Sequence, residues 1–166
     1  MKQKGKRNPG VLVLVALLVG MAANAVFAHS GNSAMQSGPR VEATTPALSG
    51  YDPVAYFDEG RPVRGSGYHT ADFKGVTYLF ASENHQKKFL ANPGKYAPQY
   101  GGYCAYGVAV GKKFHSDPNA WKIVNGKLYL NLDRDIQKKW NQDIRGYIAK
   151  AETNWKEIEF KAPAKL

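Results

Sequence analysis

The sequence predicts a small α+β domain with β-hairpins, a short central helix and a long C-terminal amphipathic helix. Two strand–turn–strand patterns indicate the hairpins, one turning at Lys74-Gly75 and the other at Asn125-Gly126, a strong hairpin signal. An apolar stripe with spacings of three and four residues indicates the long helix. Its members are Ile136, Trp140, Ile144, Tyr147, Ile148, Ala151 and Trp155.

The first hairpin, with strands over residues 69–73 and 76–81, leads into the central helix. Ser82 is suited to the N-cap because its hydroxyl can accept a hydrogen bond from a free amide of the first turn. We expect this helix to end at Asn92-Pro93-Gly94, a sequence that cannot easily continue it. The order of elements is therefore hairpin and then helix.

The second hairpin, with strands over residues 121–124 and 127–131, precedes the apolar stripe. Asp133 is placed to cap one long helix that carries the whole stripe. Gly146 weakens this helix by about 1 kcal/mol relative to alanine. The stripe is most simply a core face, and a docking face for a partner protein is the alternative.

The first 28 residues have the pattern of a secretory signal peptide, with a cationic start, an apolar run and small residues before a polar stretch. Cleavage after Ala25 or Ala28 fits the pattern, and Ala28 is favoured because it leaves a polar start at His29. The apolar run is shorter than the ~20 residues of a membrane span. We therefore expect a periplasmic or secreted protein with no stable membrane span after cleavage, and an uncleaved anchor is the alternative.

The remaining chain predicts a flexible linker over residues 29–47, one domain over 48–160 and a disordered tail over 161–166. No internal repeat is evident. Loss of residues 1–28 removes four basic residues and no acidic ones, so the net charge falls from +10 to +6. The basic residues are scattered and no nucleic-acid motif is present, which argues against nucleic acid as a partner.

A stretch rich in tyrosine and glycine, residues 96–109, contains the single cysteine, Cys104. Glycines permit close approach of the backbone, so this stretch predicts a shaped wall. Tyr100, Tyr103 and Tyr106 are candidate residues for binding a cofactor or small ligand. The alternative is that they fill the core.

Several segments, in order and spacing, resemble the YHS domain family. They are Tyr51-Asp52-Pro53-Val54, residues 75–82 (GVTYLFAS) and residues 89–96 (FLANPGKY). The continuation over residues 98–106 looks like the exported, single-domain bacterial branch of that family. The resemblance implies a small α+β unit related to TRASH-type metal-binding modules. Metal-linked members carry cysteines at the positions of Ala55, Ala81 and His85, and here only His85 could act as a ligand.

Copper or zinc is the metal that a soft thiolate with imidazoles would favour. The candidate ligands are Cys104, His69, His85 and His115, which are far apart in sequence, so only the fold could bring them together. Each has an alternative role: Cys104 as a small buried apolar residue, and the histidines as structural or solvated side chains.

The sequence therefore predicts an exported YHS-domain binding protein that handles a soft transition metal ion, copper or zinc. The alternative is an accessory module that binds a small ligand or an envelope partner protein. A cysteine-dependent enzyme is less favoured, because no cysteine-protease, C-x-x-C or G-x-S-x-G motif is present, and no catalytic residue is assigned.

Overall fold

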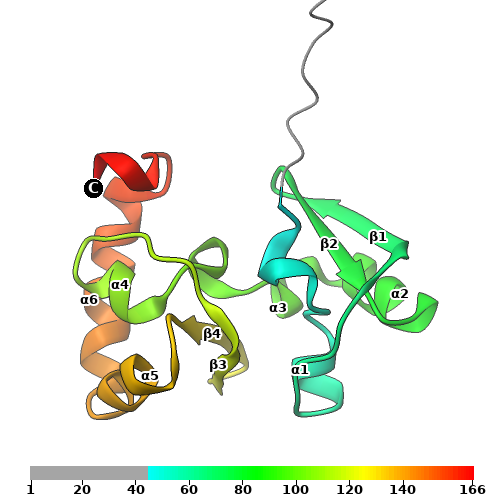
Figure 1. Ribbon diagram of the computed structural model, residues 1–166, viewed down its shortest axis with the longest axis horizontal. Coiled ribbons are helices and arrows are strands. Elements are labelled where there is room, and N and C mark those ends of the chain that lie inside the picture. The colour runs from blue at the N-terminus through cyan, green and yellow to red at the C-terminus, as the bar shows by residue number, and fades with distance from the viewer. Residues whose placement is uncertain (1–44) are drawn as a thin grey trace, which may run out of the picture. The chain divides into compact units, whose positions relative to one another are not determined.

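The computed structural model describes residues 45–166, which form two antiparallel β-hairpins and several helices (Figure 1). The predicted α+β class is confirmed. The predicted signal peptide and residues 29–44 of the predicted linker lie outside the described residues. The elements, in chain order, are η1 (Ala47–Gly50), α1 (Ala55–Asp58), β1 (Ser66–Phe73), β2 (Val76–Phe80), α2 (Glu83–Ala91), α3 (Pro93–Tyr96), η2 (Gln99–Gly102), α4 (Ala105–Ala109), β3 (Asp117–Val124), β4 (Lys127–Asn131), α5 (Arg134–Asn141), α6 (Ile144–Ile158) and η3 (Pro163–Lys165).

The structure contains two copies of one hairpin–helix unit, which corrects the expectation of a chain without an internal repeat. We name residues 46–97 the first repeat and residues 98–158 the second repeat. Each hairpin pairs a strand of eight residues with one of five, and each has an irregularity in register near the start of its longer strand. The end pairs Ser66–Phe80 and Asp117–Asn131 correspond at a constant offset of 51 positions.

The turns of the two repeats have the same backbone conformation. Lys74 and Asn125, the first turn residues of the hairpins, have φ angles of 52° and 51°. The turn in η1 has φ angles of 54°, 54° and 83° over residues 48–50, and the turn in η2 has 55°, 61° and 83° over residues 100–102. Positive φ is costly for residues other than glycine, so its recurrence at matching positions indicates one shared backbone design.

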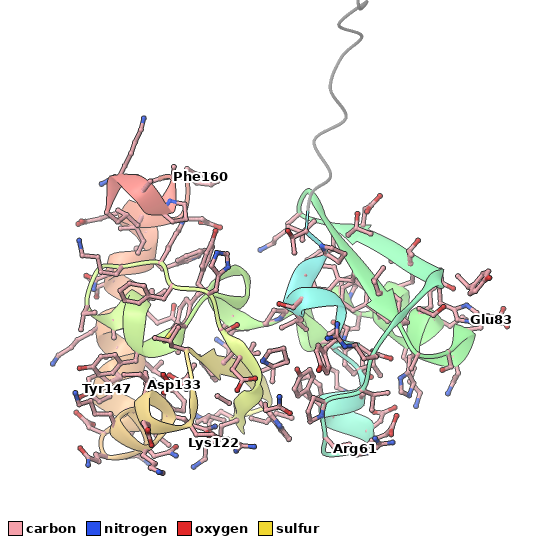
Figure 2. All side chains as sticks on the ribbon, in the orientation of Figure 1. Arg61, Glu83, Lys122, Asp133, Tyr147 and Phe160 are labelled. Atoms are coloured by element: carbon pink, nitrogen blue, oxygen red, sulfur yellow. The ribbon has the colours of Figure 1, made fainter. Side chains whose placement is uncertain are left out.

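The helices of the two repeats also start in the same way. Ser82 accepts a hydrogen bond from the third amide after it at the start of α2, and Asp133 does the same for α5. Asn92 and Asp143 cap the next helices, α3 and α6, through equivalent bonds. Figure 2 shows Asp133 before α5. The predicted caps at Ser82 and Asp133 are confirmed.

The long C-terminal helix begins later than expected. The predicted single helix from Asp133 is wrong, because the chain forms α5 and then restarts as α6 at Ile144. Asp143 interrupts the first helix and caps the second, accepting a hydrogen bond from the Gly146 amide at 2.9 Å. A Cβ atom at Gly146 would collide with the Asp143 carboxylate, so the glycine permits the cap.

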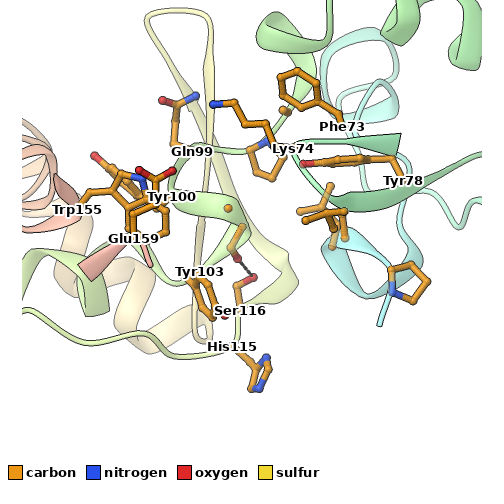
Figure 3. Close-up of a pocket in the computed structure, with 18 of the residues that line it drawn as sticks. Phe73, Lys74, Tyr78, Gln99, Tyr100, Tyr103, His115, Ser116, Trp155 and Glu159 are labelled. Atoms are coloured by element: carbon orange, nitrogen blue, oxygen red, sulfur yellow. Dashed lines mark hydrogen bonds between the residues drawn. The ribbon is translucent and has the colours of Figure 1, made fainter. Parts of the chain in front are cut away.

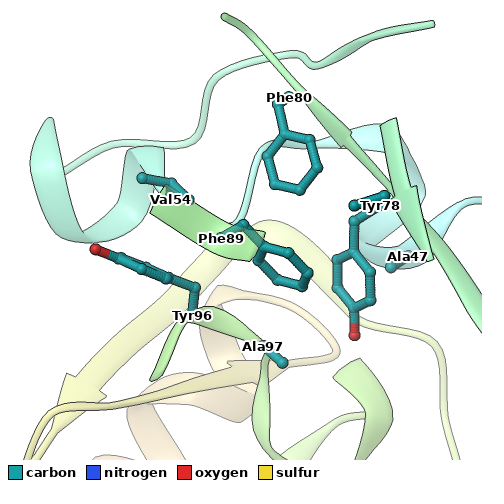
Figure 4. Close-up of a cluster of buried hydrophobic side chains, with 8 residues drawn as sticks. Ala47, Val54, Tyr78, Phe80, Phe89, Tyr96 and Ala97 are labelled. Carbon is teal, nitrogen blue, oxygen red and sulfur yellow. The ribbon is translucent and has the colours of Figure 1, made fainter. Parts of the chain in front are cut away.

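Buried apolar clusters fill each repeat. The first repeat is centred on the fully buried Phe80 and Phe89, with Tyr78 and Tyr96 around them (Figure 4). The second repeat is centred on Trp140, the counterpart of Phe89, with Val108 and α6 residues such as Ala151. A third cluster joins the repeats and consists of Leu48, Tyr56, Leu128 and Leu130.

The C-terminal residues include a short 3-10 turn, η3, and Leu166 packs against the core of the second repeat. The disordered tail expected over residues 161–166 stays a prediction. Among residues 45–166, no helix combines the length and apolar character needed to cross a bilayer.

Candidate functional site

A cavity of about 640 Å³ has walls from both repeats (Figure 3). One wall comes from the first hairpin and carries Phe73, Val76 and Tyr78, and the other comes from η2 and α6 and carries Tyr100 and Trp155. Phe160, 93% exposed, lies at its rim. The polar side chains of the lining include Lys74, Gln99, His115, Ser116, Glu152 and Glu159.

The wall of the second repeat is held by contacts among its aromatic rings. The ring centroid of Trp155 lies 5.8 Å from that of Tyr100 and 6.4 Å from that of Tyr103. The Tyr100 hydroxyl donates to the Glu152 carboxylate at 3.4 Å, a long hydrogen bond. Burial, followed by the nearby Glu152 charge, raises the pKa of Tyr100, so the phenol stays protonated. These contacts fix the wall without a ligand.

Lys113 also holds this wall in place, from the side that faces away from the cavity. Its ammonium group lies 5.2 Å from the Tyr103 ring centroid and 5.1 Å from the Trp155 ring centroid. It donates to the backbone carbonyls of Glu159 and Lys161 at 2.7 and 2.8 Å. Burial lowers its pKa, opposed by the Glu159 charge. The side chain therefore joins the end of α6 to the aromatic wall.

Of the three tyrosines predicted to bind a ligand, Tyr100 and Tyr103 line the cavity. Tyr106 instead lies in α4, where its ring packs against Tyr147 of α6 with centroids 5.1 Å apart. Of the four predicted metal ligands, only His115 lines the cavity.

Cys104 lies inside the second repeat and is fully buried. Its sulfur caps α4, accepting a hydrogen bond from the Gly107 amide at 3.3 Å, and its thiol faces the Asn131 Oδ1 at 3.9 Å. Burial raises the pKa of this thiol. Because a thiolate is the reactive and metal-binding form, this setting favours a structural role.

His85 lies in the first repeat, where its Nδ1 is 2.7 Å from the carboxylate of the buried Asp52. His69 lies in β1. Within residues 45–166, no three side chains of His, Cys, Asp or Glu are grouped so that they could hold a metal ion. The fold thus leaves the predicted ligands on separate elements.

Sequence reasoning missed three residues of the site: Tyr78, Lys113 and Trp155. Tyr78 and Trp155 carry the expected signals of a strand and of a core stripe, and nothing local marks them as cavity residues. The offset of 51 positions between the two hairpins was the sequence signal for the repeat. Gln-Lys-Lys at residues 86–88 recurs at 137–139, and Tyr-Leu at 78–79 recurs at 129–130.

Comparison with protein-family models, with curated proteins and with solved structures found no match to this chain.

Proposed function

We propose that this chain is an exported, YHS-like binding module that takes a small organic ligand in the cavity between the first hairpin and α6. The observation that carries the proposal is the cavity itself. Its volume of about 640 Å³ lies in the range of ligand pockets, roughly 300–1,000 Å³. Its lining combines aromatic rings with polar side chains, and ligand sites use both kinds of group.

The walls are suited to binding because their side chains are already positioned. Tyr100 is held by Glu152, and Trp155 is held by Lys113 and by the tyrosine rings. A ligand therefore need not order these side chains, which reduces the entropic cost of binding. The proposed site includes Tyr100 and Tyr103 and omits Tyr106 and Cys104.

The test is an NMR-detected screen of small aromatic and alicyclic compounds against the purified protein. We expect resonances of cavity residues to shift, and Trp155→Leu to weaken the binding of each hit by tenfold or more. Trp121→Leu is the matched control, because Trp121 packs on Tyr56 outside the cavity. Circular dichroism checks that both variants fold. The proposal fails if no compound binds, or if the hits are insensitive to Trp155→Leu.

A metal-binding function makes a different prediction, which the same protein can test. If copper or zinc binds through the cysteine, titration with copper(I) or zinc gives stoichiometric binding that Cys104→Ser abolishes. We expect no such thiol-dependent binding, because Cys104 is buried and its raised pKa disfavours the thiolate. Stoichiometric binding lost in Cys104→Ser would restore the metal hypothesis.

Export is part of the proposal because it rests on the pattern of residues 1–28. N-terminal sequencing of the protein recovered from the producing cell should find His29 as the first residue. An intact Met1 would remove this part of the proposal and leave the cavity unaffected.

A further inference from the structure

The Tyr78 hydroxyl, in the cavity wall, has no hydrogen-bond partner among residues 45–166. Tyr78 of β2 is only 5% exposed, and its ring packs against Phe89 with centroids 4.8 Å apart. The hydroxyl points away from the phenylalanines of the core and toward the cavity (Figures 3 and 4). The Tyr78 ring is therefore part of the core, while its hydroxyl oxygen faces the cavity.

Within residues 45–166 the structure gives this hydroxyl no hydrogen-bond partner, and burial is the one cause that raises the pKa of Tyr78 to about 12. The phenol is thus a neutral donor at any physiological pH. The hydroxyl oxygen is not fully enclosed by protein atoms, so it opens onto the cavity. The Tyr100 hydroxyl on the opposite wall is instead occupied by Glu152. The Tyr78 hydroxyl is therefore free to donate a hydrogen bond to a ligand.

The groups around Tyr78 indicate which kind of ligand its hydroxyl would bind. Lys74, in the turn of the same hairpin, also lines the cavity and adds a second donor on this wall. The side chains beside these donors are apolar, such as Phe73 and Val76. Across the cavity, the rings of Tyr100 and Trp155 offer apolar faces, and Glu152 and Glu159 would repel an accepting oxygen turned toward them. The Tyr78 side therefore favours an accepting group, while Glu152 and Glu159 disfavour one turned toward them.

We propose that the Tyr78 hydroxyl is the polar anchor of the site, and that the ligand is a flat, apolar compound carrying one hydrogen-bond-accepting oxygen, a carbonyl or a carboxylate. This inference rests on the proposed function, because it assigns a ligand class to the same cavity. A fixed donor that a bound ligand shields from water discriminates against a ligand of equal shape that lacks the acceptor, since the donor then stays unpaired.

The test compares 2-acetylnaphthalene with 2-isopropenylnaphthalene, in which a methylene group replaces the carbonyl oxygen. Dissociation constants come from NMR titration of the purified protein. We expect the acetyl compound to bind about tenfold more tightly, the gain of one hydrogen bond to a donor in the cavity wall. Tyr78→Phe should remove that difference, because it deletes the hydroxyl and keeps the ring that packs on Phe89.

Tyr129→Phe is the matched control. Tyr129 is the counterpart of Tyr78 in the second repeat, is similarly buried and lies outside the cavity lining. This variant should leave the affinities of both compounds unchanged. Equal binding of the two compounds to the wild type, or a tenfold preference that persists in Tyr78→Phe, would overturn the anchor and leave the cavity as a binding site. Failure of both compounds to bind would overturn the anchor, and the proposed function fails with it only if the screen of small compounds also finds no ligand.

Discussion

The two repeats place different side chains at the same buried position of the backbone. In the first repeat the position holds Asp52, whose amide bonds to the Val63 carbonyl at 2.9 Å. In the second repeat it holds Cys104, whose amide bonds to the Phe114 carbonyl at 3.0 Å. Both side chains are fully buried and both accept a hydrogen bond from the backbone just after them. The backbone thus needs an acceptor here, and either residue type supplies it.

This comparison explains the single cysteine. Asp52 accepts hydrogen bonds from the amides of Val54 and Ala81, each at 2.8 Å, and pairs with His85. In the equivalent turn of the second repeat, Cys104 accepts a hydrogen bond through its sulfur, a weaker acceptor. The position equivalent to His85 holds Ile136. The cysteine is thus the apolar counterpart of a buried aspartate.

The repeats differ again in their third helix, and this difference builds the cavity. In the first repeat the helix is the single turn α3, which stops at Tyr96 because Pro98 disfavours helical geometry at Ala97. In the second repeat the equivalent helix continues as α6 for 15 residues. Ala97 and Pro98 line one part of the cavity, and the added length of α6 supplies Glu152, Trp155 and Glu159 to another.

The largest effect expected from the comparison follows the loss of Asp52. Asp52→Ala leaves the amides of Val54 and Ala81 and the His85 Nδ1 without their acceptor, which should reduce the free energy of unfolding by about 3–5 kcal/mol. Cys104→Ala loses one weak sulfur acceptor and a small buried volume, and should cost about 1–2 kcal/mol. Urea unfolding measures both. Equal losses of unfolding free energy would contradict the larger contribution to stability expected from Asp52.

An intermediate effect is expected when the Asp52–His85 pair is placed at the equivalent positions of the second repeat, 104 and 136. Cys104→Asp alone buries a carboxylate without the imidazole, and Ile136→His alone supplies an imidazole without a carboxylate at position 104. The double variant restores the pairing seen between Asp52 and His85. A double-mutant cycle should therefore show a favourable coupling of roughly 1–3 kcal/mol in the free energy of unfolding. Purely additive losses would show that the two positions are not equivalent in space.

The smallest effect concerns alkaline stability. Burial holds the pKa of the Cys104 thiol above its ordinary value of 9.0. Above pH 9 the unfolded chain loses this proton before the folded chain does, so stability falls as pH rises, by at most about 1.4 kcal/mol per pH unit from this group.

Cys104→Ser should remove that slope between pH 9 and 10, as measured by urea unfolding at a series of pH values. Buried tyrosines such as Tyr56 and Tyr78, whose pKa values are raised by burial, should add a similar loss in both proteins above pH 10. Identical slopes for wild type and Cys104→Ser between pH 9 and 10 would show that the folded thiol ionises as readily as the unfolded one.

Local chemistry made much of the fold predictable. The turns at Lys74-Gly75 and Asn125-Gly126 formed as predicted, because turn geometry depends on residues adjacent in sequence. The caps at Ser82 and Asp133 formed for the same reason. The break before α6 was missed because the apolar stripe continues through it, while the competing cap at Asp143 depends on a single side chain.

The candidate site was predictable only in part. The glycine-rich stretch correctly indicated a wall, and Tyr100 and Tyr103 lie on it. The opposite wall comes from a hairpin more than twenty residues earlier, and Trp155 comes from a helix about fifty residues later. Spacing within one segment carries no information about such distant neighbours, so Tyr78 and Trp155 remained unassigned.

The sequence by itself determined the α+β class, the two hairpins and most helix starts, since each depends on turn residues, caps and periodicity within a short window. Only the tertiary structure decided the surroundings of Tyr78 and of the four predicted metal ligands, Cys104 among them. Burial, the pKa of a thiol and the partner of a hydroxyl depend on packing between distant segments. The same packing showed that a cysteine and an aspartate occupy one position of a repeated backbone.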